Sequence, residues 1–180
     1  LPIPASAESQ AACLDFIVER LRNWLLESGE RFDVVEAVVS VQGNNPARAS
    51  QAVRQLSAWI ARPDWNRILP AYARCVRITR PAGGAAAAAY QPLPDTEPAE
   101  LELFAALQTA EETLRQLPGS RTPDDFLNAF LPMIPAVDRF FEAVLVMVED
   151  EAVRLNRLAL MGRIAVLAEG VADLAKLEGF

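Results

Sequence analysis

Apolar residues recur every three or four positions along most of the chain, a spacing that predicts a series of amphipathic α-helices. The first helix is expected to begin after Ser6, which can cap it, and to end near Glu27, before Gly29. Its apolar stripe comprises Leu14, Ile17, Val18, Leu21 and Leu25. Cys13 and Trp24 belong to the same apolar pattern, and we predict that both are core residues.

Capping residues, prolines and the same periodicity predict further helices. Their approximate ranges are 34–41, 46–61, 63–79, 99–117, 123 to the break at Pro132, 150–168 and 171–177. Asp33 followed by Glu36 resembles a capping box at the start of the first of them. Pro70 lies inside the third, where we expect a kink or a break near Leu69. Gly170 permits a bend before the last, short helix.

Two segments interrupt the helical pattern. Residues 81–98 contain paired glycines, a run of five alanines and several prolines, and we interpret them as an internal linker. Val144–Val148 has high strand propensity, but nothing else alternates with period two, so a buried loop or a helix end is expected there. The prediction is an all-α fold, a bundle of about seven to eight helices in a single domain over residues 1–180.

The residue types present limit the chemistry that the chain can perform. It contains no histidine and a single lysine, Lys176, so histidine-based catalysis and a Walker phosphate loop are excluded. Cys13 and Cys75 are too far apart in sequence to form a metal-binding motif. No apolar run approaches a membrane span and no secretory signal is visible, so we expect a cytoplasmic protein. Because the chain starts at Leu1, we expect a fragment of a longer protein or a processed chain.

Arginines are concentrated in two places in an otherwise acidic protein. The net charge is −7, yet residues 46–80 hold seven arginines and one acid, a net +6, which leaves −13 elsewhere. Such a segment attracts polyanions even when the overall sign would repel them. A second group, Arg154 and Arg157, follows the acidic residues 149–151 on one face of a later helix. Both groups suit phosphate or base contacts, and they suit helix-stabilising ion pairs equally well, such as one between Asp150 and Arg154.

Four segments, in order along the chain, resemble the C-terminal anticodon-binding domain of the bacterial glycyl-tRNA synthetase β subunit. This helical bundle is often called the DALR domain and is shared in broad form with arginyl-tRNA synthetase. The segments are Phe32–Val41, Leu69–Arg80, Asp124–Leu160 and Val171–Leu177. The chain has Glu151–Arg154 (Glu-Ala-Val-Arg) in place of the Asp-Ala-Leu-Arg tetrapeptide, and Arg77 where the family usually has Asn.

The resemblance implies a role in loading glycine onto its tRNA. The intact enzyme uses ATP and Mg²⁺ for this ligase reaction, and its aminoacylation site lies on the α subunit, or on the α part where the two subunits are fused. The present chain is then expected to be non-catalytic, to hold no cofactor or metal, and to dock the anticodon region of tRNA(Gly). Its other expected partners are the remainder of the β subunit and the α subunit, with no role for DNA or a membrane.

For such an anticodon binder, basic side chains hold phosphates, and arginine or aromatic planes stack on bases. The candidate RNA-binding residues are Arg74, Arg77, Arg80, Arg154 and Arg157. Phe140 and Phe141 are expected in the core, while Trp59 or Trp65 could offer an exposed base platform. Two alternatives stay open: an anticodon-binding domain of another synthetase, with the arginyl type nearest, and a helical protein-interaction module that does not bind RNA.

Overall fold

The computed structural model describes residues 6–80 and 90–180. Within these ranges the chain forms α-helices, short 3₁₀ turns and no strand, so the predicted all-α fold is confirmed. The α-helices are α1 (Ala7–Glu27), α2 (Phe32–Gln42), α3 (Pro46–Ile60), α4 (Trp65–Thr79), α5 (Pro98–Gln116), α6 (Pro123–Phe130), α7 (Ile134–Ala143) and α8 (Glu151–Val166). Two 3₁₀ turns are η2 (Leu131–Met133) and η3 (Leu174–Lys176).

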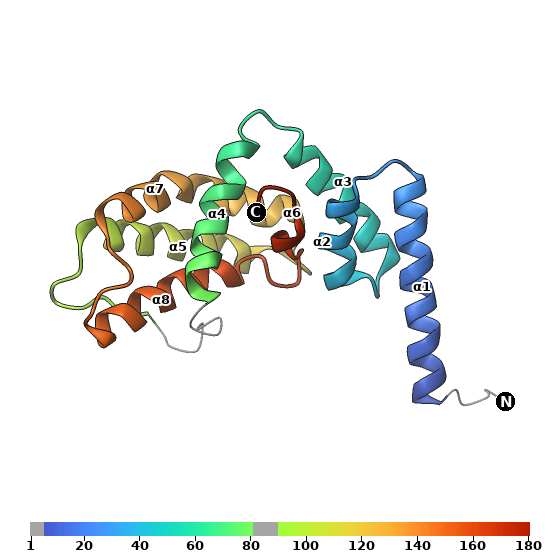
Figure 1. The fold of residues 1–180 in the computed structure, drawn as a ribbon, viewed down its shortest axis with the longest axis horizontal. Helices are drawn as coiled ribbons and strands as arrows, with labels where there is room; N and C mark the ends of the chain where they lie inside the picture. Colours follow the sequence, from blue (N-terminus) through green and yellow to red (C-terminus); the bar gives the residue numbers. More distant parts are fainter. Residues whose placement is uncertain (1–5, 81–89) are drawn as a thin grey trace.

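Helix α4 stands across the middle of the molecule (Figure 1). On one side of it α5, α7 and α8 form the larger part of the bundle, and on the other side α2 and α3 pack together, with α1 outermost. The most extensive contact between two helices in the described chain is the one between α4 and α8. The C-terminal segment returns to the centre, where η3 packs against α2.

Helix α1 is much less covered than its sequence predicts. Only Leu21 and Leu25, near its C-terminal end, are buried, and Val18 and Leu26 are partly buried against the core. The prediction that Cys13 and Trp24 are core residues is wrong: Cys13 is exposed, and Trp24 is 50% exposed. The other described residues therefore cover only part of the apolar face of α1.

Local capping residues set several helix starts as predicted. Ser6, Asn45 and Asp150 each accept a hydrogen bond from a backbone N–H of the first turn, at 3.1 Å. The predicted capping box at Asp33 is wrong, because α2 begins at Phe32, two residues before the predicted start, which places Asp33 in its first turn. The Asp33 carboxylate instead accepts hydrogen bonds from the Arg31 guanidinium and from the backbone N–H of Glu178.

Tertiary contacts override two further local predictions. Of the kink or break expected near Leu69, the break does not occur, because helix α4 runs unbroken through Pro70. Proline removes one backbone hydrogen bond there, while burial of residues on both sides of it holds the helix against α8. The short helix expected over 171–177 is reduced to η3. Its backbone bonds to α2 instead, since the Asp173 N–H donates to the Ala37 carbonyl at 2.8 Å and Gln42 donates to the Val171 carbonyl at 2.6 Å.

The two segments that were predicted to be non-helical differ in structure. The first nine residues of the expected linker, 81–89, lie outside the described residues. Residues 90–97 form irregular chain anchored at Tyr90, whose buried ring lies 4.7 Å from that of Phe104. Residues 144–150 form the predicted loop, with Val144 and Val146 buried and Leu145 and Met147 exposed.

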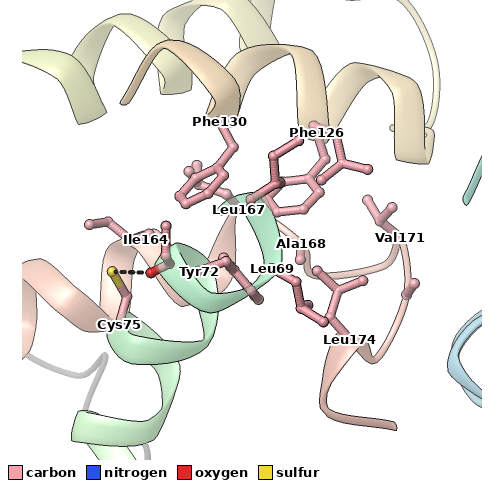
Figure 2. Close-up of a cluster of buried hydrophobic side chains, with 14 of the residues drawn as sticks. Leu69, Tyr72, Cys75, Phe126, Phe130, Ile164, Leu167, Ala168, Val171 and Leu174 are labelled. Atoms are coloured by element: carbon pink, nitrogen blue, oxygen red, sulfur yellow. Dashed lines mark hydrogen bonds between the residues drawn. The ribbon is translucent and has the colours of Figure 1, made fainter. Parts of the chain in front are cut away.

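A cluster of buried hydrophobic side chains packs against α4 (Figure 2). Leu69, Tyr72 and Cys75 of α4 meet aromatic rings of α6 and aliphatic side chains at the end of α8. The Tyr72 ring packs edge-on against Phe126 and Phe130, with centroids 5.3 and 5.6 Å away. This cluster fixes one side of α4, which leaves the opposite side of the helix available for other contacts.

Candidate nucleic-acid interface

The outer side of α4 presents three arginines from the basic segment. Arg74, Arg77 and Arg80 are exposed, and they follow one another at a spacing of three residues. The residues that bury the other side of the helix include Ile68, Tyr72, Cys75 and Thr79, which follow the three-or-four spacing of one helix face. Because the two sets occupy different faces, packing α4 on α8 necessarily turns the arginines outward.

Each of these three guanidiniums lies over an aromatic ring. The Arg74 guanidinium is 4.3 Å from the centroid of Phe141, and those of Arg77 and Arg80 are each 5.5 Å from the centroid of Phe180. No carboxylate of residues 6–80 or 90–180 lies within ion-pair distance of any of the three. A ring contact orients a guanidinium without neutralising it, so the charge and the N–H donors stay available to an anion.

A groove runs beside this arginine face, between α4 and the C-terminal half of α8. Its volume is about 470 Å³, and its lining residues are Val76, Thr79, Arg80, Gly162, Ala165, Val166 and Glu169. A smaller hollow of about 190 Å³ shares Val76, Ala165 and Glu169 with it and reaches Phe180. The arginine face therefore borders a recess with a mainly apolar floor.

The floor of the groove is uncharged and is held by a hydrogen bond between its two helices. The Tyr72 hydroxyl donates a hydrogen bond to the Ala165 carbonyl at 2.8 Å, which ties α4 to α8. Burial raises the pKa of Tyr72 well above its usual value, and burial raises the pKa of the Cys75 thiol to about 12. Neither group changes its charge near neutral pH, so charge at this surface comes from its rim.

The other predicted pair, Arg154 and Arg157, forms hydrogen bonds with other groups of the protein. Arg157 is buried and donates to the Glu100 carboxylate and to the Leu145 carbonyl, both at 2.9 Å. The Arg154 guanidinium donates to the carbonyls of Val148 and Glu149, at 2.8 and 3.1 Å. The expected ion pair with Asp150 does not form, because that carboxylate caps α8. Both arginines thus hold the loop 144–150 in place.

The five candidate arginines therefore do not share one surface. Arg74, Arg77 and Arg80 gather on α4 beside the C-terminal half of α8, whereas Arg154 and Arg157 lie at the N-terminal end of α8, away from that crossing (Figure 1). Arg67, which shares a face with Arg74 in the sequence pattern, pairs with Asp138 at 3.4 Å. The basic segment is thus divided between free and paired arginines.

The aromatic residues also have unequal roles. Trp59 is buried and donates from its indole N–H to Asp124 at 2.8 Å, so it offers no base platform. Trp65 is partly buried against the core. Phe140 is buried as predicted, and the partly buried Phe141 supports Arg74. Sequence reasoning missed Phe180, which lies at the end of the chain and outside any helical pattern.

Residues 68–174 match the model of a protein family, the DALR anticodon binding domain. This chain belongs to that family. The matched range begins in α4 and ends in η3, so it contains the arginine face, the groove and α8. Helices α1 to α3 and Phe180 lie outside it. The resemblance inferred from the sequence is confirmed.

Curated relatives of this DALR protein are glycine–tRNA ligase beta subunits. The one from Anaeromyxobacter dehalogenans (strain 2CP-C) is 38% identical over 168 residues, which cover 92% of this chain and 23% of the relative. Those from Ectopseudomonas mendocina and Aromatoleum aromaticum are 34% and 35% identical, over 93% and 96% of this chain and 24% and 25% of theirs. The chain therefore spans about a quarter of the length of these relatives.

Neither a metal-binding cluster nor a membrane-spanning helix is found among residues 6–80 and 90–180. No group of three or more Cys, Asp or Glu side chains there could hold a metal ion. No helix of residues 6–80 or 90–180 is both long and apolar enough to cross a membrane.

Proposed function

We propose that this DALR domain is the anticodon-binding part of a glycyl-tRNA synthetase β subunit, and that the arginine face of α4 holds the anticodon region of tRNA(Gly). The observation that carries the proposal is the set of three exposed guanidiniums, each over an aromatic ring and none paired with a carboxylate of the described chain. The similarity to glycine–tRNA ligase beta subunits supplies the choice of tRNA.

The physical basis of binding is phosphate neutralisation on a rigid surface. Arginine forks form charge-assisted hydrogen bonds with phosphate oxygens, and each single-strand phosphate contact adds about 0.7 to the salt slope of binding. The aromatic rings under Arg74, Arg77 and Arg80 restrict the guanidiniums, so less side-chain freedom is lost when RNA binds. We assign Arg154 and Arg157 to support of the loop 144–150, because RNA could engage Arg157 only by exposing the buried Glu100 carboxylate.

The chemistry of the parent enzyme would take place elsewhere. In this proposal the domain binds no cofactor of its own, while ATP and Mg²⁺ act at the aminoacylation site of the α subunit. The remainder of the β subunit and the α subunit are its proposed protein partners, and the cytoplasm, where translation takes place, is its proposed compartment. Docking the anticodon region would raise the share of correct tRNA presented to that distant site.

Titration with an isolated anticodon stem-loop of tRNA(Gly) tests this function. The variant in which Arg74, Arg77 and Arg80 are all replaced by Gln should bind at least about thirtyfold more weakly, since each lost charge-assisted contact costs about three- to tenfold. Arg20→Gln is the matched control, because Arg20 is also exposed over an aromatic ring but lies on α1. Equal affinity of wild type and triple variant would contradict the proposal.

The same titration distinguishes a glycyl-type from an arginyl-type anticodon-binding domain. A stem-loop of arginine tRNA, measured beside that of glycine tRNA, should bind more weakly in this proposal. Preference for the arginine stem-loop would favour the arginyl-type alternative, and absence of any RNA binding would favour a protein-interaction module.

A further inference from the structure

An acid and a base both line the groove between α4 and α8 and form no ion pair with each other. Arg80 and Glu169 both line it, from the end of α4 and from the chain just after α8. Glu169 is exposed, and its carboxylate makes no hydrogen bond or ion pair with residues 6–80 or 90–180. The two charges lie on one recess yet do not neutralise each other, so a ligand that enters it meets both.

The recess between these two charges suits a flat group. Its floor includes Val76 and Ala165, and Gly162 and Ala165 leave little side chain on α8 to fill it. The hydrogen bond from Tyr72 to the Ala165 carbonyl ties this floor to α4. The Tyr72 ring packs in turn against Phe126 and Phe130 (Figure 2). A nucleobase has two apolar faces and a polar edge, which matches an apolar floor with charge at the rim.

The two charged sides set the orientation of a nucleotide in the groove. A phosphate belongs beside Arg80 and the neighbouring Arg77, both positioned over Phe180. The polar edge of the base then points toward Glu169, whose ionised carboxylate accepts hydrogen bonds and cannot donate them. An amino group on that edge is attracted, whereas a carbonyl oxygen is repelled: cytosine presents an N4 amino group where uracil presents O4.

We infer that the α4–α8 groove receives one unpaired base bearing an exocyclic amino group, and that Glu169 accepts a hydrogen bond from this group. Glu169 thereby determines which base is preferred at one position of the bound loop, while the arginine face supplies affinity that does not depend on base. This inference rests on the proposed RNA-binding function and adds a selective site to it.

A panel of stem-loops tests the inference with this protein. The reference RNA is the anticodon stem-loop of tRNA(Gly). In each variant RNA one loop base lacks its amino group: uracil replaces cytosine, inosine replaces guanosine, or purine replaces adenine. At one position we expect the exchange to weaken binding by roughly tenfold, the low end of what one good base contact discriminates. If every exchange changed the affinity by less than about twofold, the inference would be overturned, even if binding were strong and salt-dependent.

Two variants identify the residue responsible. Glu169→Gln should reduce that discrimination to within about twofold and leave affinity for the exchanged loop unchanged, because a Gln amide can offer either an acceptor or a donor. Glu151→Gln, at an exposed acid at the start of α8, is the matched control and should keep full discrimination. Retained discrimination in Glu169→Gln would assign the selectivity to another residue and reject the role of Glu169.

A groove-filling variant tests the location independently of charge. Ala165→Leu adds bulk to the floor of the groove, so it should remove the base preference without reducing the salt slope. Thermal unfolding of this variant shows whether it is folded when tested. Loss of all RNA binding in the arginine triple variant together with intact base preference in Ala165→Leu would keep the proposed function and reject this site.

Discussion

Two groups of arginines with the same spacing of three residues behave in opposite ways in this protein. On α4, Arg74 and Arg77 point outward over aromatic rings and carry unneutralised charge. On α8, Arg154 and Arg157 turn toward the protein and donate to carbonyls of the loop 144–150. Arg157 also meets Glu100, which lies 57 residues away in the sequence. Helix spacing places an arginine on a face, and partners distant in sequence decide what that arginine does there.

The largest effect is expected from a substitution in the inward group, which consists of Arg154 and Arg157. Arg157→Met leaves the Glu100 carboxylate buried without its partner, and loss of one member of such a pair costs about 3–5 kcal/mol of unfolding free energy. Urea denaturation measures it. The double variant Arg157→Met with Glu100→Met should recover most of that loss, because two apolar side chains of similar volume replace the pair. A single variant as stable as wild type would show that the pair does not support the fold.

A smaller loss is expected at Arg154. Arg154→Gln removes hydrogen bonds to the Val148 and Glu149 carbonyls, which should cost about 1–2 kcal/mol and speed amide exchange in the loop 144–150. Hydrogen exchange read by NMR checks this. RNA affinity should stay within about twofold of wild type, since the charge lies outside the α4 face. A tenfold loss of RNA affinity without loop opening would move the RNA site to α8.

The outward group should respond in the reverse way. Arg77→Gln should lower affinity for the glycine anticodon stem-loop by about three- to tenfold, because one phosphate contact is lost. Its unfolding free energy should change by less than about 0.5 kcal/mol, as is usual for an exposed substitution. Fluorescence titration and urea denaturation of the same sample give both values. A variant that loses stability but keeps its affinity would place Arg77 with the inward group.

The smallest expected effect is that of pH. The chain contains no histidine, and arginines stay protonated across the neutral range. Burial keeps Tyr72 and Cys75 uncharged beneath the groove by raising the pKa of both. RNA affinity should therefore change by less than about twofold between pH 6 and 8 at constant salt. A steep dependence would reveal a titrating group that the arginine face does not contain.

Sequence reasoning succeeded where structure depends on neighbouring residues. Ser6, Asn45 and Asp150 fix helix starts through bonds within one turn, and the turn at Gly170 has the positive φ of 73° that glycine adopts easily. It failed where a distant segment intervenes: Asp33 bonds to the chain end instead of capping α2, and residues 171–177 bond to α2 instead of forming a helix.

The candidate site follows the same division. The periodicity of α4 was enough to place Arg74, Arg77 and Arg80 together on an exposed face. No local sequence pattern predicts that Phe180 and Glu169 lie at the site, because their positions depend on how the C-terminal segment folds back against α4. The exposure of Trp24 on α1 is likewise set by which surfaces the described chain provides, and not by the apolar pattern of the helix itself.

The salt dependence of binding tests the central claim most directly. The claim is that α4, and not the start of α8, holds the phosphates of the RNA. For the glycine anticodon stem-loop, the plot of log affinity against log salt concentration should become shallower by about 2 when Arg74, Arg77 and Arg80 are all replaced by Gln, at about 0.7 for each phosphate contact. Arg154→Gln should leave the slope unchanged. An unchanged slope in the triple variant, or a shallower one in Arg154→Gln, would contradict the account.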